Sequence, residues 1–186
     1  MSRLSIFPER SDATGLPAPL PLLVSDDPAV IQAELERRGI RFEQWPAPAD
    51  LSLGAAEAEI LAAYGDAITR VQQESSCRIV DTMRITPEHP EREVRRQQFL
   101  AEHRHDNDEM RFFVEGQGLF CFHIDQEVLL TLCERGDLIS VPAGTRHWFD
   151  MGSKPAFCVL RFFSDNEGWL ANYTGDPIAE RFPGLD

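Results

Sequence analysis

The chain has 186 residues and lacks the features that mark membrane and secreted proteins. It contains no run of roughly 18 consecutive apolar residues, the length that a transmembrane helix needs. Its first residues, MSRLSIFPERSDATG, also lack the apolar segment of a secretory signal. We therefore expect a soluble, cytoplasmic protein without a membrane partner.

Positively charged residues are scarce as well. Lys and Arg number 18 against 31 Asp and Glu, which gives a formal net charge of −13 at pH 7. Such a charge repels phosphate backbones and anionic membranes, so we expect no nucleic-acid partner. An anionic substrate would need local arginines to offset this field.

Cysteine is sparse, and no CxxC pair occurs. The four cysteines are scattered, and several have apolar neighbours: Cys77, Cys121, Cys133 and Cys158. Isolated cysteines of this kind favour buried, reduced thiols over disulfides.

The first part of the chain carries helical patterns. Residues 28–39 and residues 56–74 have apolar side chains at helical spacing. Ser25 or Asp26 is the expected cap of the first helix. Segment 40–47 alternates and ends near prolines, which predicts an edge strand between the two helices.

From Cys77 onward the pattern becomes that of β-strands. Short runs rich in Val, Ile and Phe recur at intervals of about ten residues, interrupted by one predicted helix over residues 89–100. We expect a single, mainly β (α+β) domain built on an antiparallel barrel. In it, residues 1–76 would form a helical and irregular cover, residues 77–163 the barrel with a metal site, and residues 164–186 a tail packed on the barrel.

Two spaced motifs predict this metal site. The first reads His103-Arg104-His105, three residues, Glu109, six residues, Gly116; the second reads Gly136, five residues, Pro142-Ala143-Gly144, two residues, His147. His103, His105 and Glu109 are all at odd positions, so their side chains would lie on one face of an extended chain. Residues 106–108 are expected to bend the chain between His105 and Glu109. The candidate metal ligands are His103, His105, Glu109 and His147.

The ligand types limit the metal. Structural zinc ordinarily uses cysteine, and none lies in either motif. Three imidazoles and one carboxylate suit Fe(II), Ni(II), Co(II) or Mn(II), and an octahedral ion would keep two positions open for a substrate, water or O2. His89 and His123 match neither motif, and we expect both to be structural.

The two motifs resemble those of the cupin superfamily, with Met151 where an Asn is frequent. Three longer segments, HRHDNDEMRFFVEGQGLF, VPAGTRHWFDMG and GWLANYTGDPIAERFPG, are similar to the acireductone dioxygenase family. The similarity runs from the first predicted helix to the last residues. It implies a cupin-type antiparallel β-barrel, or jelly roll, with N-terminal covering helices.

The resemblance also implies an activity in methionine salvage. The substrate would be 1,2-dihydroxy-5-(methylthio)pent-1-en-3-one, an acireductone that reacts with O2. With Fe(II), the family forms 4-methylthio-2-oxobutanoate and formate; with Ni(II), it forms 3-methylthiopropionate, formate and carbon monoxide. One metal ion per monomer and a monomeric enzyme are expected. Another metal-dependent cupin dioxygenase, or a cupin that binds a ligand without catalysis, remains an alternative.

Residue roles follow from the resemblance by matching position. The four candidate ligands above become the metal ligands, and Arg111 stabilises the substrate dianion. Glu102 would aid metal loading, and Asp108 would relay local conformational change. From the residues alone, Arg111 could instead form a surface ion pair, and the two carboxylates could be solvated loop groups.

Two further residues are candidates for the substrate pocket. Arg161 lies in the apolar segment AFCVLRFF, so it is either a second pocket cation or an exposed strand residue. Trp169 would wall the pocket or serve as a core aromatic residue.

Overall fold

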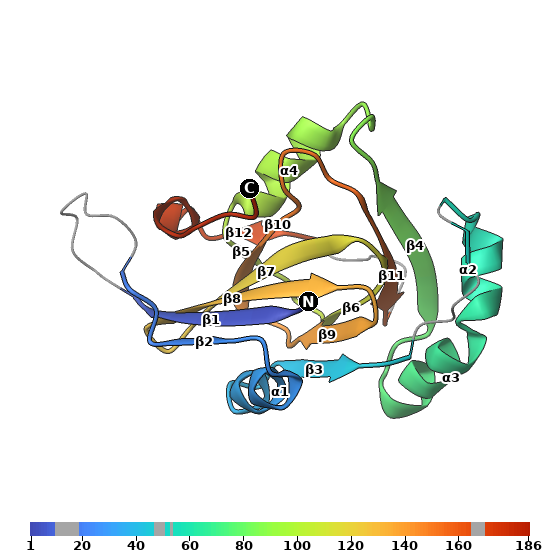
Figure 1. Cartoon of the computed structure of the whole chain (residues 1–186), viewed down its shortest axis with the longest axis horizontal. Helices are drawn as coiled ribbons and strands as arrows, with labels where there is room; N and C mark the ends of the chain where they lie inside the picture. Colours follow the sequence, from blue (N-terminus) through green and yellow to red (C-terminus); the bar gives the residue numbers. More distant parts are fainter. Residues whose placement is uncertain (10–18, 47–50, 53, 165–169) are drawn as a thin grey trace.

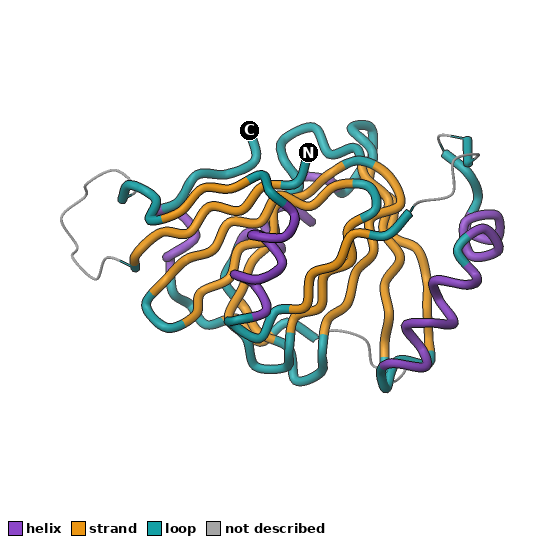
Figure 2. Tube along the Cα trace, turned by 60° about the horizontal axis from the view of Figure 1, so that its bottom comes forward, coloured by secondary structure: helices purple, strands orange, loops and turns teal. Residues whose placement is uncertain are grey.

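The computed structural model describes residues 1–9, 19–46, 51–52, 54–164 and 170–186. Two antiparallel sheets, one of seven strands and one of five, form its centre (Figure 1). In Figure 2 the strands fill the middle of the view, one helix lies in front of them and further helical turns lie at the right side. The fold class predicted from the sequence, mainly β with antiparallel sheets and a few helices, is confirmed.

The seven-stranded sheet has the order β12-β5-β10-β7-β8-β1-β2. Its strands are β1 (Arg3–Pro8), β2 (Leu23–Ser25), β5 (His103–Arg104), β7 (Gln117–Ile124), β8 (Glu127–Glu134), β10 (Arg146–Asp150) and β12 (Asn172–Tyr173). Strand β5 is only two residues long and lies next to the edge strand β12.

The five-stranded sheet has the order β3-β9-β6-β11-β4. Its strands are β3 (Arg41–Gln44), β4 (Ile79–Ile85), β6 (Glu109–Glu115), β9 (Asp137–Val141) and β11 (Phe157–Phe163). The edge strand predicted over residues 40–47 is therefore confirmed as β3.

Strand alternation separates two apolar layers. In β11, Phe157 and Val159 enter the core between the sheets, where Phe120 and Phe149 of the other sheet also lie. Leu160 and its even-numbered neighbours instead face a second cluster on the outer side of the five-stranded sheet. Because side chains alternate along a strand, every odd-numbered residue of β11 faces the interior.

Two helices, α2 (Glu57–Ala63) and α3 (Gly65–Glu74), cover that outer side and are visible beside β4 in Figure 1. The continuous helix expected over residues 56–74 is therefore wrong. The chain leaves the helix at Tyr64, where φ is −98° and ψ is 15°, and a new helix begins at Gly65.

Helix α1 (Pro28–Glu36) packs against β3 and buries Ile31 and Leu35. Its cap is Asp27, not Ser25 or Asp26 as expected, because the Asp27 side chain accepts a 2.9 Å hydrogen bond from the Ala29 backbone N–H. Pro28 then occupies the first turn, where its missing N–H costs no helical hydrogen bond.

The segment before residue 77 also contributes strands to the barrel. Strands β1, β2 and β3 pair within the two sheets, so this part of the chain does more than cover them. β1 was not predicted, because the run RLSIFP is short and ends in proline. Among the described residues, no helix is both long and apolar enough to span a membrane.

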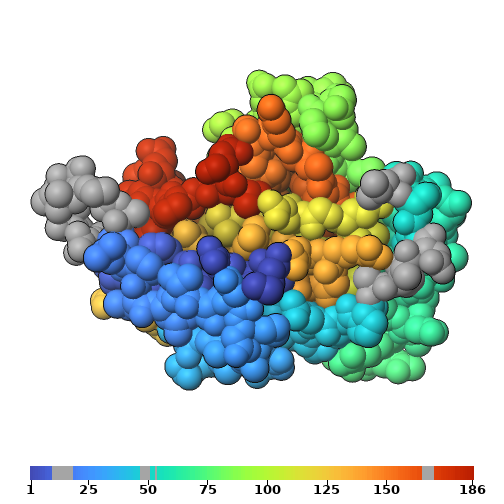
Figure 3. Space-filling view, viewed as in Figure 1, coloured from blue at the N-terminus to red at the C-terminus, as the bar shows by residue number. Residues whose placement is uncertain are grey.

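Helix α4 (Arg92–Leu100), the helix predicted over residues 89–100, lies at the top of Figure 1 and packs against β10. A short 3-10 helix, η1 (Pro177–Arg181), buries Ile178 beside Trp148 on the outer side of the seven-stranded sheet. In Figure 3 the C-terminal residues lie on the same face of the molecule as the N-terminal strands.

The glycines of the two motifs allow sharp turns. Gly116 has a φ of +69° and Gly136 a φ of +96°, the left-handed region that favours glycine. A Cβ on Gly116 would also lie 1.8 Å from the Ala156 carbonyl oxygen, so the backbone approaches too closely for any other residue. All four cysteines are free and buried, which confirms the sequence-based expectation.

Candidate metal centre

Three histidines from two neighbouring strands converge inside the barrel. His103 of β5 pairs in register with His147 of β10, and His105 follows directly after β5. The rings of His103 and His147 have centroids 4.5 Å apart, and His105 lies 5.0 and 5.1 Å from these two rings. One ligand atom from each of the three residues lies within 4.8 Å of the others, so the triad is a candidate metal site.

Backbone carbonyls fix the orientation of the three rings. Nδ1 of His103, His105 and His147 lies 2.7, 2.8 and 2.8 Å from the carbonyl oxygens of Ala101, Leu170 and Thr145. A carbonyl only accepts hydrogen bonds, so each Nδ1 carries the proton. A neutral ring then presents an unprotonated Nε2 to a metal, the arrangement expected of ligating histidines.

Glu109, the first residue of β6, lies beside two of these histidines. Its Oε2 atom lies 3.0 Å from Nε2 of His147 and 3.2 Å from Nε2 of His105, and the residue is only 1% exposed. Because Nδ1 of His105 and of His147 donates to a carbonyl, a neutral ring would direct the lone pair of its Nε2 at the Glu109 carboxylate. A proton or a divalent metal between these groups relieves the opposition, so Glu109 and the two rings form a candidate donor set.

Electrostatics keep His103 neutral and Glu109 ionised, whereas Glu109 favours the protonated form of His105. Burial and the neighbouring His147 lower the pKa of His103 to about 4, so its ring is neutral near pH 7. Burial also opposes the charged form of His105, but the hydrogen bond to Glu109 outweighs it and raises the pKa of His105. Burial raises the pKa of Glu109, yet the Arg111 charge and both histidine contacts hold it well below its usual range.

Arg111 lies two residues after Glu109 on β6 and faces the same interior. It is 6% exposed, and its Nε lies 2.6 Å from Oε1 of Glu109. Its guanidinium carbon lies 5.2 Å from the Phe120 ring centroid and 5.0 Å from that of Phe149. The alternative of a surface ion pair is therefore wrong, because the pair with Glu109 is buried in aromatic surroundings.

Glu102 is not a solvated loop carboxylate either. It is 2% exposed, and its Oε1 accepts a 2.7 Å hydrogen bond from Nδ1 of His123. Its Oε2 accepts a hydrogen bond from the Thr174 hydroxyl, and the other ring nitrogen of His123 lies 2.8 Å from Oε2 of Glu9. His123 is thus structural, as predicted, and it links Glu102 to the end of β1.

The other candidates lie at different places around the site. Asp108 is exposed, and its Oδ1 accepts a 2.9 Å hydrogen bond from the Ala143 backbone N–H in the turn before His147. Arg161 of β11 is partly buried and forms a bidentate ion pair with Asp81 of β4. Trp169 lies outside the described residues.

Tyr173 is a site neighbour that the sequence analysis missed. Its ring centroid lies 5.8 Å from that of His103, because β12 pairs with β5 and places Tyr173 opposite this histidine. The only sequence signal was the segment NYTG itself, which carries no metal or catalytic motif. The residue became visible only through the strand pairing.

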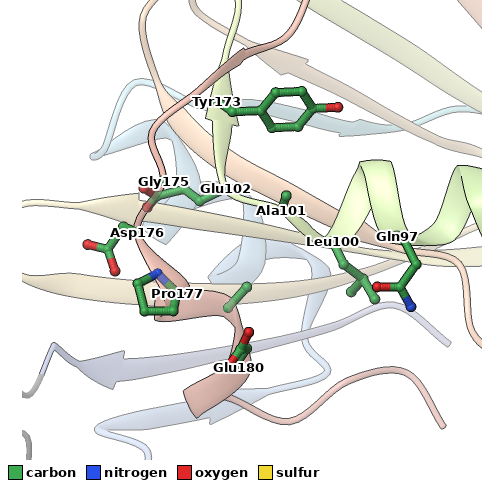
Figure 4. A pocket seen from close by; sticks show the side chains of 10 residues that line it. Gln97, Leu100, Ala101, Glu102, Tyr173, Gly175, Asp176, Pro177 and Glu180 are labelled. Carbon is green, nitrogen blue, oxygen red and sulfur yellow. The ribbon is translucent and has the colours of Figure 1, made fainter.

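A pocket of about 430 Å³ adjoins the ligand strand on its other side. Figure 4 shows Tyr173 and Glu102 at one end of this pocket and Pro177 and Glu180 at the other. None of the three clustered histidines lines it. Tyr173 therefore borders this pocket and also lies beside a ring of the candidate metal centre.

Two facing antiparallel sheets with an inward-facing histidine triad define the class: a cupin barrel with a metal site. The model of the ARD/ARD' family matches residues 22–171. The chain belongs to this family of acireductone dioxygenases, and it is a metal-dependent dioxygenase.

Individual relatives agree over the full length. An acireductone dioxygenase of Parasynechococcus marenigrum (strain WH8102) is 62% identical over 186 residues, covering 100% of both chains. One of Prochlorococcus marinus (strain MIT 9303) is 62% identical over 185 residues, again covering 100% of both. A solved structure, acireductone dioxygenase from Bacillus anthracis with a cadmium ion in its active centre, superposes with a TM-score of 0.78 at 25% identity. It covers 93% of this chain and 98% of that chain.

Proposed function

We propose that this enzyme cleaves 1,2-dihydroxy-5-(methylthio)pent-1-en-3-one with O2 in methionine salvage. The observation that carries the proposal is the meeting of three Nε2 atoms and one buried carboxylate beside the guanidinium of Arg111. A chelating enediolate needs a metal and a fixed positive charge, and this site supports both requirements.

Four residues would hold the metal: His103, His105, Glu109 and His147. The donor set of three imidazoles and a carboxylate suits Fe(II) and Ni(II), and both are proposed as cofactors, with one ion per monomer. When bound, the metal would act as a Lewis acid and a template for a substrate that binds through two oxygens. The cadmium ion in the Bacillus anthracis structure supports a divalent cation at the corresponding centre.

Arg111 would stabilise the negative charge of the substrate. Its guanidinium keeps its proton although burial lowers its pKa, and Phe120 and Phe149 shield it from water. In such surroundings an ion pair with a desolvated enediolate is stronger than in water. The aromatic surfaces would also keep water away from the reacting carbons.

Two residues retain family-derived roles as proposals. Glu102 would assist metal loading from beside His103, and Asp108 would transmit movement to the turn at Ala143 that leads to His147. Trp169 and Arg161 would border the substrate pocket.

Reconstitution with defined metals tests the proposed function. Metal-free protein is loaded separately with Fe(II) or Ni(II), supplied with acireductone and O2, and assayed for oxygen uptake, formate and carbon monoxide. We expect carbon monoxide and 3-methylthiopropionate with Ni(II) alone, and 4-methylthio-2-oxobutanoate with Fe(II). Absence of oxygen uptake with either metal would overturn the proposal and favour a ligand-binding cupin.

The proposed working state is a monomer in the cytoplasm. All four proposed ligands come from one chain, so the site needs no partner subunit, and the four free cysteines suit a reducing compartment. Light scattering on the eluting protein should give a mass near 21.0 kDa. A mass near twice that value would contradict the monomer.

A further inference from the structure

A row of charged side chains crosses the interior face of the five-stranded sheet. Arg161 of β11 is in register with Arg111 of β6 on one side and with Asp81 of β4 on the other. Cross-strand partners share a face of the sheet, so all three point the same way. Since Val159, two residues before Arg161, lies in the core between the sheets, this face is the barrel interior.

Asp81 holds Arg161 in a two-point contact. Nε of Arg161 donates to Oδ1 of Asp81 at 2.8 Å, and Nη2 donates to Oδ2 at 2.6 Å. This is the geometry in which a guanidinium binds any carboxylate. The aspartate side chain therefore occupies the position that a carboxylate ligand would take.

The pair lies at the open end of the charged row. The Arg161 side chain is 29% exposed and that of Asp81 is 38% exposed, whereas Arg111 is 6% exposed. β4 is the edge strand of its sheet, so Asp81 has no further strand beyond it. A small molecule can reach Arg161 from solvent, while Arg111 lies deeper beside Glu109.

We infer that Arg161 and Asp81 form a carboxylate-binding subsite at the mouth of the barrel, in which Asp81 competes with the ligand for the guanidinium. This inference rests on the proposed function, because the ligands it assigns are the carboxylate products of that reaction. The substrate is an enediol without a carboxylate, whereas both product sets contain carboxylates. Asp81 is then a positioning residue that prevents Arg161 from retaining these products.

The competition predicts a measurable change in affinity. If the ion pair is formed about nine-tenths of the time, the apparent dissociation constant of a carboxylate is about tenfold higher than its intrinsic value. Asp81→Asn keeps the size of the side chain but removes its charge. This substitution should therefore tighten carboxylate binding by about tenfold.

Titration calorimetry on Ni(II)-loaded protein without substrate tests the inference, with formate and 3-methylthiopropionate as probes. We expect Asp81→Asn to tighten both by about tenfold and Arg161→Gln to weaken both. The double variant should behave like Arg161→Gln, because the guanidinium is the binding group. Asp81→Ser serves as a second variant if Asp81→Asn folds poorly, with folding checked by circular dichroism.

The matched control is Asp26→Asn, which removes the partner of another two-point ion pair, that of Arg3 on the surface. It should leave the affinities unchanged. An unchanged affinity in folded Asp81 variants would overturn the inference, as would a tightening that persists when Arg161 is also replaced. Acireductone turnover, measured on the same preparations, tests the proposed function separately. If the protein binds the probes as expected but does not consume O2, the proposed subsite is supported and the proposed function is rejected.

Discussion

The carboxylate of Glu102 accepts a 2.7 Å hydrogen bond from Nδ1 of His123, and both side chains are buried. This contact joins β7 to the residue that precedes His103. Since neighbouring residues of a strand face opposite sides, Glu102 anchors the outer side of the ligand strand while His103 faces the metal centre.

Replacing His123 with Leu should destabilise the protein. Glu102 would keep its contact with Thr174 but lose its histidine partner in a buried site, at a cost of about 2–4 kcal/mol. Urea unfolding of the metal-free protein measures this free energy. His89→Leu is the control, because the His89 ring is partly exposed and accepts a 3.2 Å hydrogen bond from the nearby Glu91 backbone N–H. Equal stability of the two variants would contradict a structural role for His123.

Replacing His105 with Ala should remove the metal while leaving the barrel folded. His105 follows a two-residue strand, so little packing depends on its ring, whereas the proposed coordination loses a donor. Metal content after gel filtration, measured by mass spectrometry, should fall at least about tenfold. His89→Ala should retain the wild-type metal content. Stoichiometric metal in His105→Ala would remove this residue from the ligand set.

Replacing Arg111 with Met should lower turnover by about 10²–10³-fold while metal binding persists. The buried guanidinium is the nearest fixed positive charge to Glu109, and no neutral side chain can stabilise a substrate dianion in its place. Steady-state kinetics and metal content are measured on the same sample. Arg84→Met, which breaks an ion pair with Glu115, is the control. Wild-type turnover in Arg111→Met would exclude this arginine from the reaction.

Asp150 should make stability depend on acid pH. It is buried, which raises its pKa, but hydrogen bonds from Arg96 and from the backbone N–H groups of Leu185 and Gly152 outweigh this and lower it. A carboxyl group with a lowered folded-state pKa stabilises the protein above its unfolded pKa of about 3.9 and loses this contribution as pH falls through the folded value.

Asp150→Asn should therefore cost about 1–3 kcal/mol at pH 7 and much less at an acid pH below the lowered folded-state pKa of Asp150. Urea unfolding at both pH values measures the difference. Asp66→Asn, a change in the first turn of α3 away from this network, should show no comparable pH dependence. A constant cost of Asp150→Asn across the pH range would argue against the ionic origin of the contribution.

The strands of the barrel and the metal motifs could be predicted because their signals are local. Alternating Val, Ile and Phe residues predict β4 and β6 to β11, and the spacing of the histidines predicts the three-histidine cluster. Strand β1 gave a weaker signal because it has only six residues and ends at Pro8. Its place between β2 and β8 depends on pairing with residues more than a hundred positions later.

The chemistry around the ligands was harder to predict, because it depends on pairing between distant strands. Nothing in the local sequence indicates that Glu102 is buried against His123 or that Asp81 lies opposite Arg161. Residues near Tyr64 posed a different problem. Their apolar spacing continues through both α2 and α3, so the pattern did not reveal the break between the helices.

The two-residue length of β5 determines when the metal centre can form during folding. Its pairings join it to β10 and β12, and the carbonyl that orients His105 belongs to a residue 65 positions later. Contacts between residues so far apart in the sequence require long loops to close, which slows their formation. The three histidines therefore come together only once β5 has paired with β10, so we expect the ion to bind after this pairing and not to nucleate the fold. Under this expectation, a cell short of metal contains folded protein that can still be loaded.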